Sequence, residues 1–428
     1  MARDSLYPVS VKAGKPILGM LPTGWQKLSL EKCLNIEARK AYIQDNQEYD
    51  LVTVKRSRGG VIRREHLKGK DISVKSQFYI KEGDFLISKR QIVHGACGLV
   101  PKELSGSIVS NEYCVLTGKS GFYLPYMEFL SESLYFQQTC FHSSIGVHIE
   151  KMIFKLDSWF KWPFNIPPLS EQKRIVKILS TWDKAISVTE KLLTNSQQQK
   201  KALMQQLLTG KKRLLDENGV RFSGEWEKGK FCDMANIDTG YAFKSKDFTQ
   251  SDSGIPIIRM SDFKTGGLDV LGAAKVDRDS VNGLDKFKLR VGDFVFGMSG
   301  SLNNYGRVEK KDLPCYLNQR VGRILAKECA NQAFITYLYL SDSIQQSILD
   351  KAAGAAQLNI SISDLRSMVV YYPCIEEQQK IAAVLSAADA EISTLEKKLA
   401  CLRDEKKALM QQLLTGKRRV KVDEAVAE

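Results

Sequence analysis

Apolar side chains recur at alternating steps of four and three residues through two long stretches of the chain. In the later stretch the repeating positions are Ile381, Leu385, Ala388, Ile392, Leu395, Leu399, Leu402, Lys406, Leu409 and Leu413. In the earlier stretch they are Ile175, Leu179, Trp182, Ile186, Thr189, Leu193, Ser196, Lys200, Leu203 and Leu207. A lysine interrupts the apolar pattern in each stretch, and Thr189 and Ser196 are also polar in the earlier one. The heptad spacing is typical of helices that pair along a continuous seam. The pattern predicts two long helices packed against each other.

The two stretches are copies of one segment. Residues 167–213 match residues 373–419 at 25 of 47 positions with a constant offset of 206, and both contain KKALMQQLLTGK. Each copy starts at a proline, which disfavours helix in the preceding residue, and ends in Thr-Gly-Lys. Gly210 and Gly416 suit the left-handed position that follows a helix. Because each helix follows a similar stretch of chain, we expect the two helices to run antiparallel in a pseudo-twofold arrangement.

Outside these helices, apolar runs separated by turn residues predict strand-rich domains. IKEGDFLI at 80–87 and LRVGDFVF at 289–296 each indicate a Gly-Asp turn that leads into an apolar strand. We therefore predict an α/β (α+β) protein made by tandem duplication. Its expected parts are a variable domain at 1–166, a helical spacer at 167–213, a second variable domain at 214–372, a second helical spacer at 373–420 and a tail at 421–428.

The charge of the chain narrows the choice of partners. There are 63 lysines and arginines against 49 aspartates and glutamates, which gives a net charge of +14. Basic side chains near phosphates release condensed counterions and gain affinity, so this excess indicates a polyanionic partner. Charge alone does not separate DNA from RNA or from a membrane surface.

Other features of the composition argue against several classes of protein. No apolar run is long enough to span a bilayer, and MARDSLYPVSVKAG at the N-terminus lacks an apolar signal core. We therefore expect a cytoplasmic protein without a membrane partner. The nine cysteines contain no CxxC pair, which indicates reduced thiols rather than disulfides or a zinc site. His66, His94, His142 and His148 show no metal-ligand spacing, so no metal site is expected.

Two short motifs raise the question of catalysis. NIPPL at 165–169 is similar to the Asn-Pro-Pro-aromatic motif of adenine N6-methyltransferases, but an isoleucine intervenes and leucine replaces the aromatic residue. GMSGSLNNYG at 297–306 lacks both GxGxxG and GxxxxGK, whose spacing wraps backbone amides round phosphates. We therefore expect no catalytic residue in this chain.

The helix starts carry a family resemblance. PPLSEQKRIVKIL, its repeat PCIEEQQKIAAVL, and the segments GDFVFGMSGSLNN and LNQRVGRI resemble the specificity subunit of type I restriction–modification systems. The resemblance covers nearly the whole chain and implies two DNA target-recognition domains that alternate with two conserved helical regions. It implies a non-catalytic subunit that reads an asymmetric bipartite site on double-stranded DNA. It also implies docking of two methyltransferase (modification) subunits and, through them, restriction/translocase subunits. S-adenosylmethionine, ATP and Mg would belong to those partners, and no cofactor to this chain.

Candidate DNA-binding residues lie beside turns in both domains. KRSRGG at 55–60 and SKRQ at 88–91 present Lys55, Arg56, Arg58, Lys89 and Arg90. In the second domain, the segments that resemble the family's recognition loops contain Lys244, Arg259, Ser299, Asn303, Asn304 and Arg320. Arginine suits bidentate contacts to guanine, and lysine suits contacts to phosphate.

Two other functions remain as alternatives. A self-sufficient enzyme such as a methyltransferase would modify DNA without a partner protein. A purely structural coiled-coil scaffold would not select DNA over random competitor.

Overall fold

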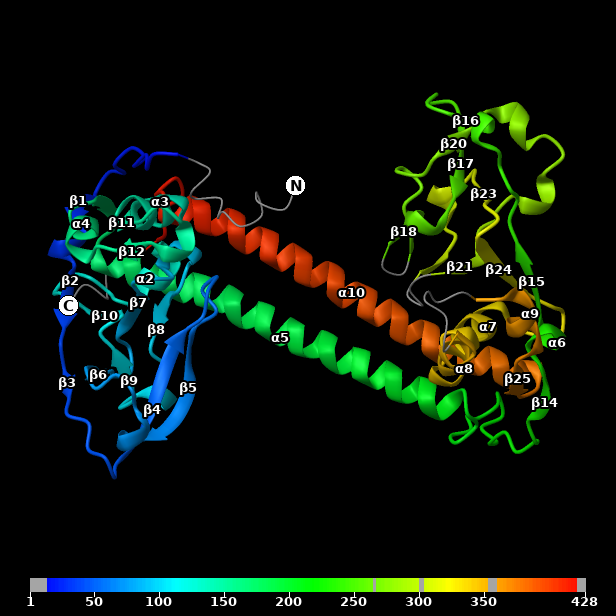
Figure 1. The fold of residues 1–428 in the computed structure, drawn as a ribbon, viewed down its shortest axis with the longest axis horizontal. Coiled ribbons are helices and arrows are strands. Elements are labelled where there is room, and N and C mark those ends of the chain that lie inside the picture. Colours follow the sequence, from blue (N-terminus) through cyan, green and yellow to red (C-terminus); the bar gives the residue numbers. More distant parts are fainter. Residues whose placement is uncertain (1–13, 265–266, 300–303, 353–359, 422–428) are drawn as a thin grey trace. The chain divides into compact units, whose positions relative to one another are not determined.

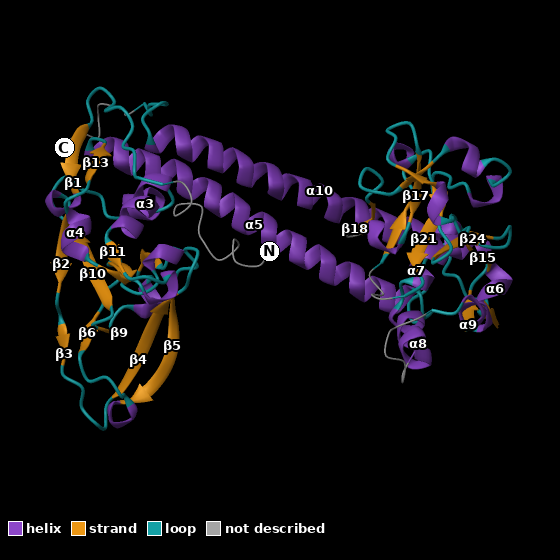
Figure 2. Ribbon diagram, turned by 45° about the horizontal axis from the view of Figure 1, so that its top comes forward, coloured by secondary structure: helices purple, strands orange, loops and turns teal. Residues whose placement is uncertain are grey.

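The computed structural model describes residues 14–264, 267–299, 304–352 and 360–421. The chain forms two compact units, one of Met1–Thr189 with Lys398–Glu428 and one of Glu190–Lys397. Each unit contains one strand-rich domain together with part of helix α5 (Leu169–Leu207) and part of helix α10 (Ile375–Leu414). The two domains and both helices are drawn in Figure 1 and Figure 2. The expected alternation of strand-rich domains with long helices is confirmed.

Two sheets form the frame of the first domain. The first sheet has the strand order β2 (Leu34–Glu37), β10 (Tyr113–Gly118), β7 (Phe85–Ser88) and β8 (Cys97–Leu99). The second has the order β3 (Lys40–Ala41), β6 (Gln77–Tyr79), β9 (Ile108–Ser110), β4 (Glu48–Val54) and β5 (Val61–Lys68). Strand β4 pairs in parallel with β9 and antiparallel with β5, so the hairpin β4–β5 forms one edge of the second sheet.

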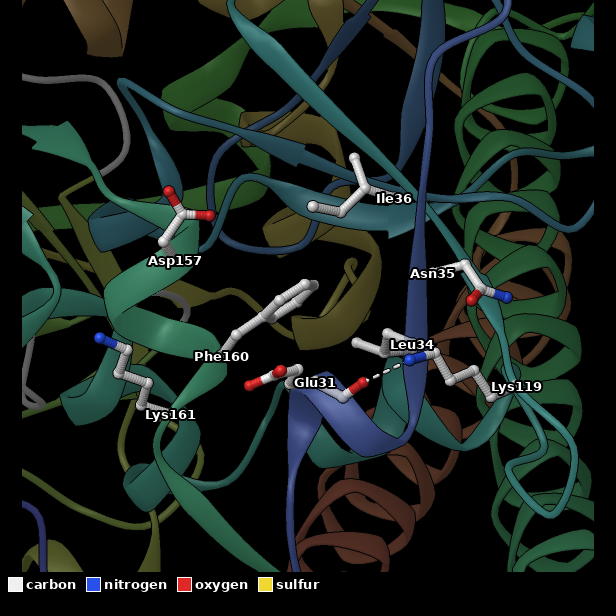
Figure 3. A pocket seen from close by; sticks show the side chains of 8 residues that line it. All are labelled: Glu31, Leu34, Asn35, Ile36, Lys119, Asp157, Phe160 and Lys161. Carbon is white, nitrogen blue, oxygen red and sulfur yellow. Dashed lines mark hydrogen bonds between the residues drawn. The ribbon is translucent and has the colours of Figure 1, made fainter.

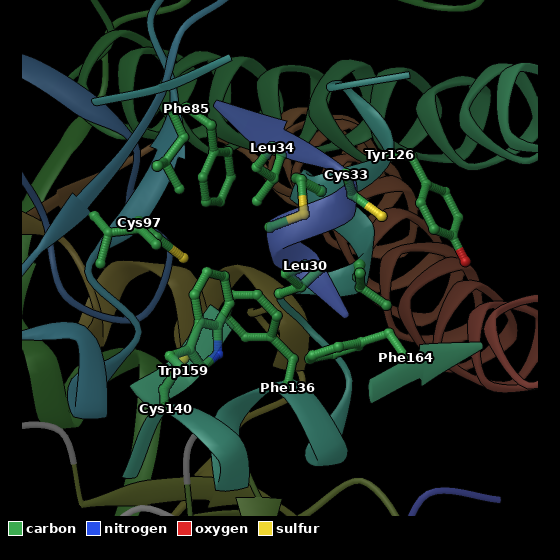
Figure 4. Packing of buried hydrophobic residues seen from close by; sticks show 14 of the residues in the cluster. Leu30, Cys33, Leu34, Phe85, Cys97, Tyr126, Phe136, Cys140, Trp159 and Phe164 are labelled. Atoms are coloured by element: carbon green, nitrogen blue, oxygen red, sulfur yellow. The ribbon is translucent and has the colours of Figure 1, made fainter. Parts of the chain in front are cut away.

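Short elements close the first domain over an aromatic core. They are β1 (Gln26–Ser29), β13 (Pro163–Ile166), β11 (Ser144–Ile145), β12 (Ile153–Phe154), α2 (Tyr126–Leu130), α3 (Leu134–His142) and α4 (Leu156–Phe160). Figure 4 shows Phe136, Trp159 and Phe164 together in this core. Phe136 and Trp159 meet edge to face with ring centroids 5.2 Å apart, an arrangement that aromatic quadrupoles favour. Ile175 of α5 and Leu413 of α10 belong to the same core, so both helices are anchored in this domain.

The second domain repeats this plan with different strands. Its first four-stranded sheet has the order β15 (Ala235–Thr239), β24 (Val321–Ala326), β21 (Phe294–Gly297) and β22 (Tyr305–Arg307). Its second has the order β16 (Phe248–Thr249), β20 (Lys275–Val276), β17 (Ile255–Ile258) and β23 (Tyr316–Leu317). Strand β17 pairs in parallel with β23, as β4 does with β9. The other elements are β14 (Glu227–Lys230), β25 (Val369–Tyr372), β18 (Phe263–Lys264), β19 (Gly267–Leu268), α6 (Phe231–Met234), α7 (Gln332–Tyr339), α8 (Asp342–Ala352) and α9 (Ile362–Ser367).

The two predicted Gly-Asp turns precede the central strands β7 and β21. Gly83 and Gly292 have φ angles of 80° and 93°, in the left-handed region that favours glycine. The carboxylates of Asp84 and Asp293 each accept a hydrogen bond from the N–H three residues earlier, at 2.7 and 3.0 Å. All residues of β7 and β21 are buried. The turn therefore sets where each central strand begins, and both predicted strands are confirmed.

The antiparallel pairing of the long helices is visible within each unit. In the first unit, Lys406 of α10 donates to Asp183 of α5 at 2.6 Å. In the second unit, the repeat-related residues Lys200 and Asp389 pair at 2.5 Å. Ser196 donates to Glu391 at 3.1 Å in the same unit. Because higher numbers on α5 face lower numbers on α10, the helices run antiparallel, as predicted.

The lysine that interrupts each predicted seam is therefore paired. Lys406 also lies over the ring of Phe129, 5.5 Å from its centroid, and Lys200 lies 5.6 Å from the centroid of Tyr337. An aspartate and an aromatic ring thus compensate each charge at a position where a heptad would hold a hydrophobic residue. A polar pair at such a position also favours one register of the two helices over others.

Candidate nucleic-acid interface

The tip of hairpin β4–β5 has a strained backbone. Ser57 and Arg58 have φ angles of 56° and 55°, and the N–H of Gly59 donates to the carbonyl oxygen of Arg56 at 3.1 Å. Two consecutive left-handed residues at the centre of a turn define a type I′ turn, which normally takes asparagine and glycine. For residues such as serine and arginine, the left-handed conformation costs about 1–3 kcal/mol per residue. The tip therefore needs contacts elsewhere to hold it.

Those contacts come from the loop that follows β7. The N–H of Ser57 donates to the carbonyl oxygen of His94 at 2.7 Å, and the N–H of Arg58 donates to that of Gly95 at 2.8 Å. The exposed side chains of Lys55, Arg56 and Arg58 thus project from a backbone that is bonded on both sides of the turn. Fixing the backbone before binding lowers the entropic cost of placing these side chains on a ligand.

A carboxylate faces this basic tip. Glu150, in the short 3-10 helix Ile149–Lys151, accepts a hydrogen bond from Nη2 of Arg56 at 2.6 Å. Its other oxygen lies 3.3 Å from Nε2 of His94. Burial lowers the pKa of His94, and the opposing effect of Glu150 is smaller. A neutral His94 at pH 7 leaves Arg56 as the cation that Glu150 neutralises.

The second basic segment of this domain faces the turn between β9 and β10. The Nζ of Lys89 donates to the carbonyl oxygen of Asn111 at 2.6 Å. The Nε of Arg90 donates to Glu112 at 2.6 Å. Arg90 precedes by only a few residues the His94–Gly95 loop that holds the hairpin tip. The structure thus brings both predicted basic segments to the loop after β7.

Four of the predicted residues in the second domain lie at neighbouring strand ends. Arg259 follows β17, Ser299 follows β21, and Arg320 lies in the turn after β23. Asn304 accepts a hydrogen bond at its carbonyl oxygen from the N–H of Gly297, the last residue of β21, at 2.7 Å. The parallel strands β17 and β23 end side by side, and the N–H of Met298, the residue before Ser299, donates to the carbonyl oxygen of Arg320 at 3.1 Å. These polar residues therefore lie on adjoining loops of the sheets.

Of the two remaining predicted residues, the structure describes one. Lys244 is exposed and precedes the 3-10 helix Ser245–Asp247, where its N–H donates to Asp247 at 2.8 Å. Asn303 lies outside the described residues. The partners Glu112 and Glu150 were not expected from the sequence, because each lies more than twenty positions from its arginine and no local pattern links the two.

The first domain has a hollow on its surface beside β2. This hollow of about 440 Å³, shown in Figure 3, is lined by Glu31, Leu34, Asn35, Ile36, Lys119, Asp157, Phe160 and Lys161. Within this hollow, the Nζ of Lys119 donates a hydrogen bond to the backbone carbonyl oxygen of Glu31 at 2.7 Å. Among the described residues, no group of three histidine, cysteine or acidic side chains is placed to hold a metal ion. In the same part of the chain, no helix is both long and apolar enough to cross a membrane.

Comparison with known proteins places these features in a family. A model described as the type I restriction modification DNA specificity domain matches residues 22–195 and again residues 223–402. The chain is 30% identical over 311 residues to the type I restriction enzyme MjaVIII specificity subunit of Methanocaldococcus jannaschii, and the match covers 70% of each protein.

Solved structures show the same fold. The type I restriction–modification system S subunit from M. genitalium has a TM-score of 0.56 at 13% identity, covering 94% of this chain and 99% of that one. A second solved chain comes from a study of the complex assembly and conformational transition of the type I R-M system. It has a TM-score of 0.55 at 18% identity, and the match covers 92% of this chain and 98% of that one. Because the DNA specificity domain occurs twice and spans most of the sequence, this chain belongs to the type I restriction–modification DNA specificity family.

Proposed function

We propose that this chain is the DNA sequence-recognition subunit of a type I restriction–modification complex and reads an asymmetric bipartite site. The observation that carries the proposal is the double match to the DNA specificity domain, one copy on each strand-rich domain. The strand-end side chains differ between the two domains, so the two halves of the DNA site are expected to differ as well. The net charge of +14 supports a polyanionic ligand.

The predicted basic and polar residues are proposed to contact DNA from the strand ends. In the first domain these are Lys55, Arg56, Arg58, Lys89 and Arg90, which surround the loop after β7. In the second they are Lys244, Arg259, Ser299, Asn303, Asn304 and Arg320. Lysines on such loops suit phosphate, whereas arginines and amides suit the base edges of the major groove.

The long helices are proposed to dock two identical partners. The repeat places the same exposed residues twice, Lys201, Gln205, Gln206 and Thr209 in one copy and Lys407, Gln411, Gln412 and Thr415 in the other. A chain that presents one surface twice can bind two copies of one protein. By family resemblance, these are methyltransferase (modification) subunits, through which restriction/translocase subunits join. S-adenosylmethionine, ATP and Mg are proposed to bind those partners, and this chain is proposed to be non-catalytic.

DNA selectivity tests the proposal directly. The chain, assembled with the methyltransferase subunit of its own system, is mixed with a library of random duplexes, and the bound fraction is sequenced. We expect enrichment of one site made of two unlike halves separated by unread base pairs. Binding without enrichment would contradict sequence recognition and favour a structural scaffold.

A second assay separates recognition from catalysis. The purified chain is incubated alone with DNA and labelled S-adenosylmethionine, and then again with the methyltransferase subunit. We expect label in DNA only in the second reaction. Label transfer by the chain alone would identify a self-sufficient methyltransferase instead.

The docking surface is tested by charge reversal in one copy at a time. Lys201→Glu or Lys407→Glu should each leave a complex with one methyltransferase subunit, and the double variant should leave none. Native mass spectrometry counts the subunits. Two subunits on the double variant would contradict docking at this surface.

A further inference from the structure

Both domains hold the residue after the central strand in the same backbone frame. After β7, the N–H of Lys89 donates to the carbonyl oxygen of Glu112 at 2.9 Å, and its carbonyl oxygen accepts from the N–H of Phe154 at 2.8 Å. After β21, Met298 makes the corresponding two bonds, to Arg320 at 3.1 Å and from Ile360 at 2.6 Å. We call each set, the residue after the strand with its two bonded neighbours, the strand-end frame.

The strand-end frame makes residues equivalent between the two domains even though their sequences differ. Glu112 and Arg320 occupy the same place, since each carbonyl accepts the N–H of the residue after the strand. Arg90 and Ser299 occupy the next place along the chain in both domains. Phe154 and Ile360 are 206 positions apart, which is the offset of the helical repeat, whereas Lys89 and Met298 are 209 apart and Glu112 and Arg320 are 208 apart.

The same two places carry different chemistry in the two domains. In the first, Arg90 comes directly after the frame residue Lys89, and Glu112 lies in the turn. Nε and Nη2 of Arg90 lie 2.6 and 3.4 Å from the two oxygens of Glu112. In the second, Ser299 comes directly after the frame residue Met298, and the exposed Arg320 lies in the turn with no side-chain partner among the described residues. Each domain therefore presents one arginine at its strand-end frame. In the first domain the arginine follows the frame residue, and in the second it lies in the turn that bonds to the frame residue.

We propose that Arg90 and Arg320 are the specificity-determining residues of the two half-sites, each reading a guanine, and that Glu112 is a positioning residue for Arg90. This inference rests on the DNA-recognition function proposed above. A guanidinium matches the O6 and N7 acceptors of guanine with two parallel hydrogen bonds from a rigid planar fork, whereas lysine reaches them only with a flexible point charge. The frame fixes the backbone of Arg320 and of Lys89, which precedes Arg90. Glu112 orients the guanidinium of Arg90, and the remaining N–H groups of that guanidinium are left for a base.

The alternative role for either arginine is a contact to phosphate, which carries no sequence information. Arg→Lys separates the two roles, because lysine keeps the charge for a phosphate but loses the rigid planar fork that pairs with O6 and N7 of guanine. We therefore compare Arg90→Lys and Arg320→Lys with the control variants Arg64→Lys and Arg278→Lys. Arg64 and Arg278 are exposed arginines of the same two domains, on β5 and on the 3-10 helix Arg278–Val281.

The experiment uses the full chain assembled with its methyltransferase subunits. Its probes are duplexes of the wild-type site with each base pair replaced in turn. We expect Arg90→Lys to weaken the preference for guanine at one position of one half-site by about 5- to 150-fold, the range for losing a bidentate pair. Arg320→Lys should do the same at one position of the other half-site. The salt dependence of binding and the preferences at all other positions should stay as in wild type, and the control variants should change nothing.

Glu112→Gln tests the positioning role. It should weaken the same guanine preference as Arg90→Lys, and the double variant should lose no more than Arg90→Lys alone. A uniform loss of affinity over all duplexes, or unchanged preferences in folded variants, would overturn the assignment. If the wild-type complex itself prefers no duplex over random competitor, it is the DNA-recognition function that fails, so the two failures are distinguishable.

Discussion

Replacing Arg213 by alanine should destabilise the second unit more than replacing its repeat counterpart Arg419 destabilises the first. Arg213 donates to both carboxylate oxygens of Glu377, at 2.7 and 2.6 Å, and Glu377 is fully buried at the start of α10. Arg419 makes the same two bonds to Glu171 at the start of α5, both at 2.8 Å. In each unit, the arginine that follows the end of one long helix is thus bonded to the glutamate at the start of the other.

A tryptophan makes the two sites unequal. The indole N–H of Trp25 donates to Glu171 at 2.9 Å, whereas that of Trp226 has no hydrogen-bond partner among the described residues. After Arg419→Ala, Glu171 keeps a charge-assisted bond. After Arg213→Ala, Glu377 loses both of its bonds to side chains.

The magnitudes follow from burial. Removing the partner of a buried carboxylate costs about 3–5 kcal/mol, and water reduces this cost where the pair is partly exposed. The side chain of Arg213 is 20% exposed and that of Arg419 is 43% exposed. The N-terminus of each helix also stabilises the remaining negative charge. We therefore expect losses of about 3 kcal/mol for Arg213→Ala and about 1–2 kcal/mol for Arg419→Ala.

Calorimetry and hydrogen exchange together measure the effect. For a unit of this size, each kcal/mol lowers Tm by about 2–4 °C, so Arg213→Ala should lower its transition about twice as far as Arg419→Ala. Hydrogen exchange assigns each loss to a unit, since peptides of the affected helix start should exchange faster. Lys212→Ala and Arg418→Ala, which change exposed neighbours, are the matched controls.

A second variant separates charge from packing. Glu377→Gln in the Arg213→Ala background replaces the unpaired buried charge by a neutral amide, so part of the stability should return. Equal losses for the two arginines, or wild-type melting of Arg213→Ala, would refute the reasoning.

Three further predictions follow from the seam, the modular domains and the hairpin tip. Leu399→Asp, which puts a charge at a buried seam position, should lower the stability by several kcal/mol, whereas the exposed Lys398→Asp should not; thermal melts followed by circular dichroism decide. Exchanging residues 1–166 for another recognition domain of this family should change one half-site only, and methylation mapping that shows both halves changed would contradict independent domains. Glu150→Gln removes the carboxylate that pairs with Arg56, so DNA binding should tighten and the slope of log K against log salt concentration should become steeper by about one. An unchanged slope in binding titrations would exclude Arg56 from phosphate contacts.

Much of the architecture could be predicted because it depends on periodic patterns of neighbouring residues. The steps of four and three from Ile381 to Leu413 specify which face of a helix is apolar, and a helix with such a face must pack against another. The left-handed Gly210 and Gly416, with φ angles of 69° and 68°, lie just beyond the ends of α5 and α10 for the steric reason that only glycine adopts this conformation cheaply. The candidate DNA-binding segments were proposed from basic residues beside turns, and their contacts with DNA stay a prediction.

The pairing of side chains could not be predicted in the same way. Lys406 appears in the sequence as a defect of the seam, and only the fold supplies Asp183 and Phe129 as its partners. The turn at Ser57–Arg58 lacks the usual glycine or asparagine, so the sequence contains no signal for its left-handed conformation.

What the sequence determined by itself is therefore the duplication, the two paired helices and the alternation of domains, because each follows from a period or a repeat within the chain. The tertiary structure alone decided which residues share a site. Arg90 meets Glu112 and Arg56 meets Glu150 through hydrogen bonds between strands and loops that are 22 and 94 residues apart. Such contacts depend on strand order and register, which are set by the burial of the whole core rather than by neighbouring residues.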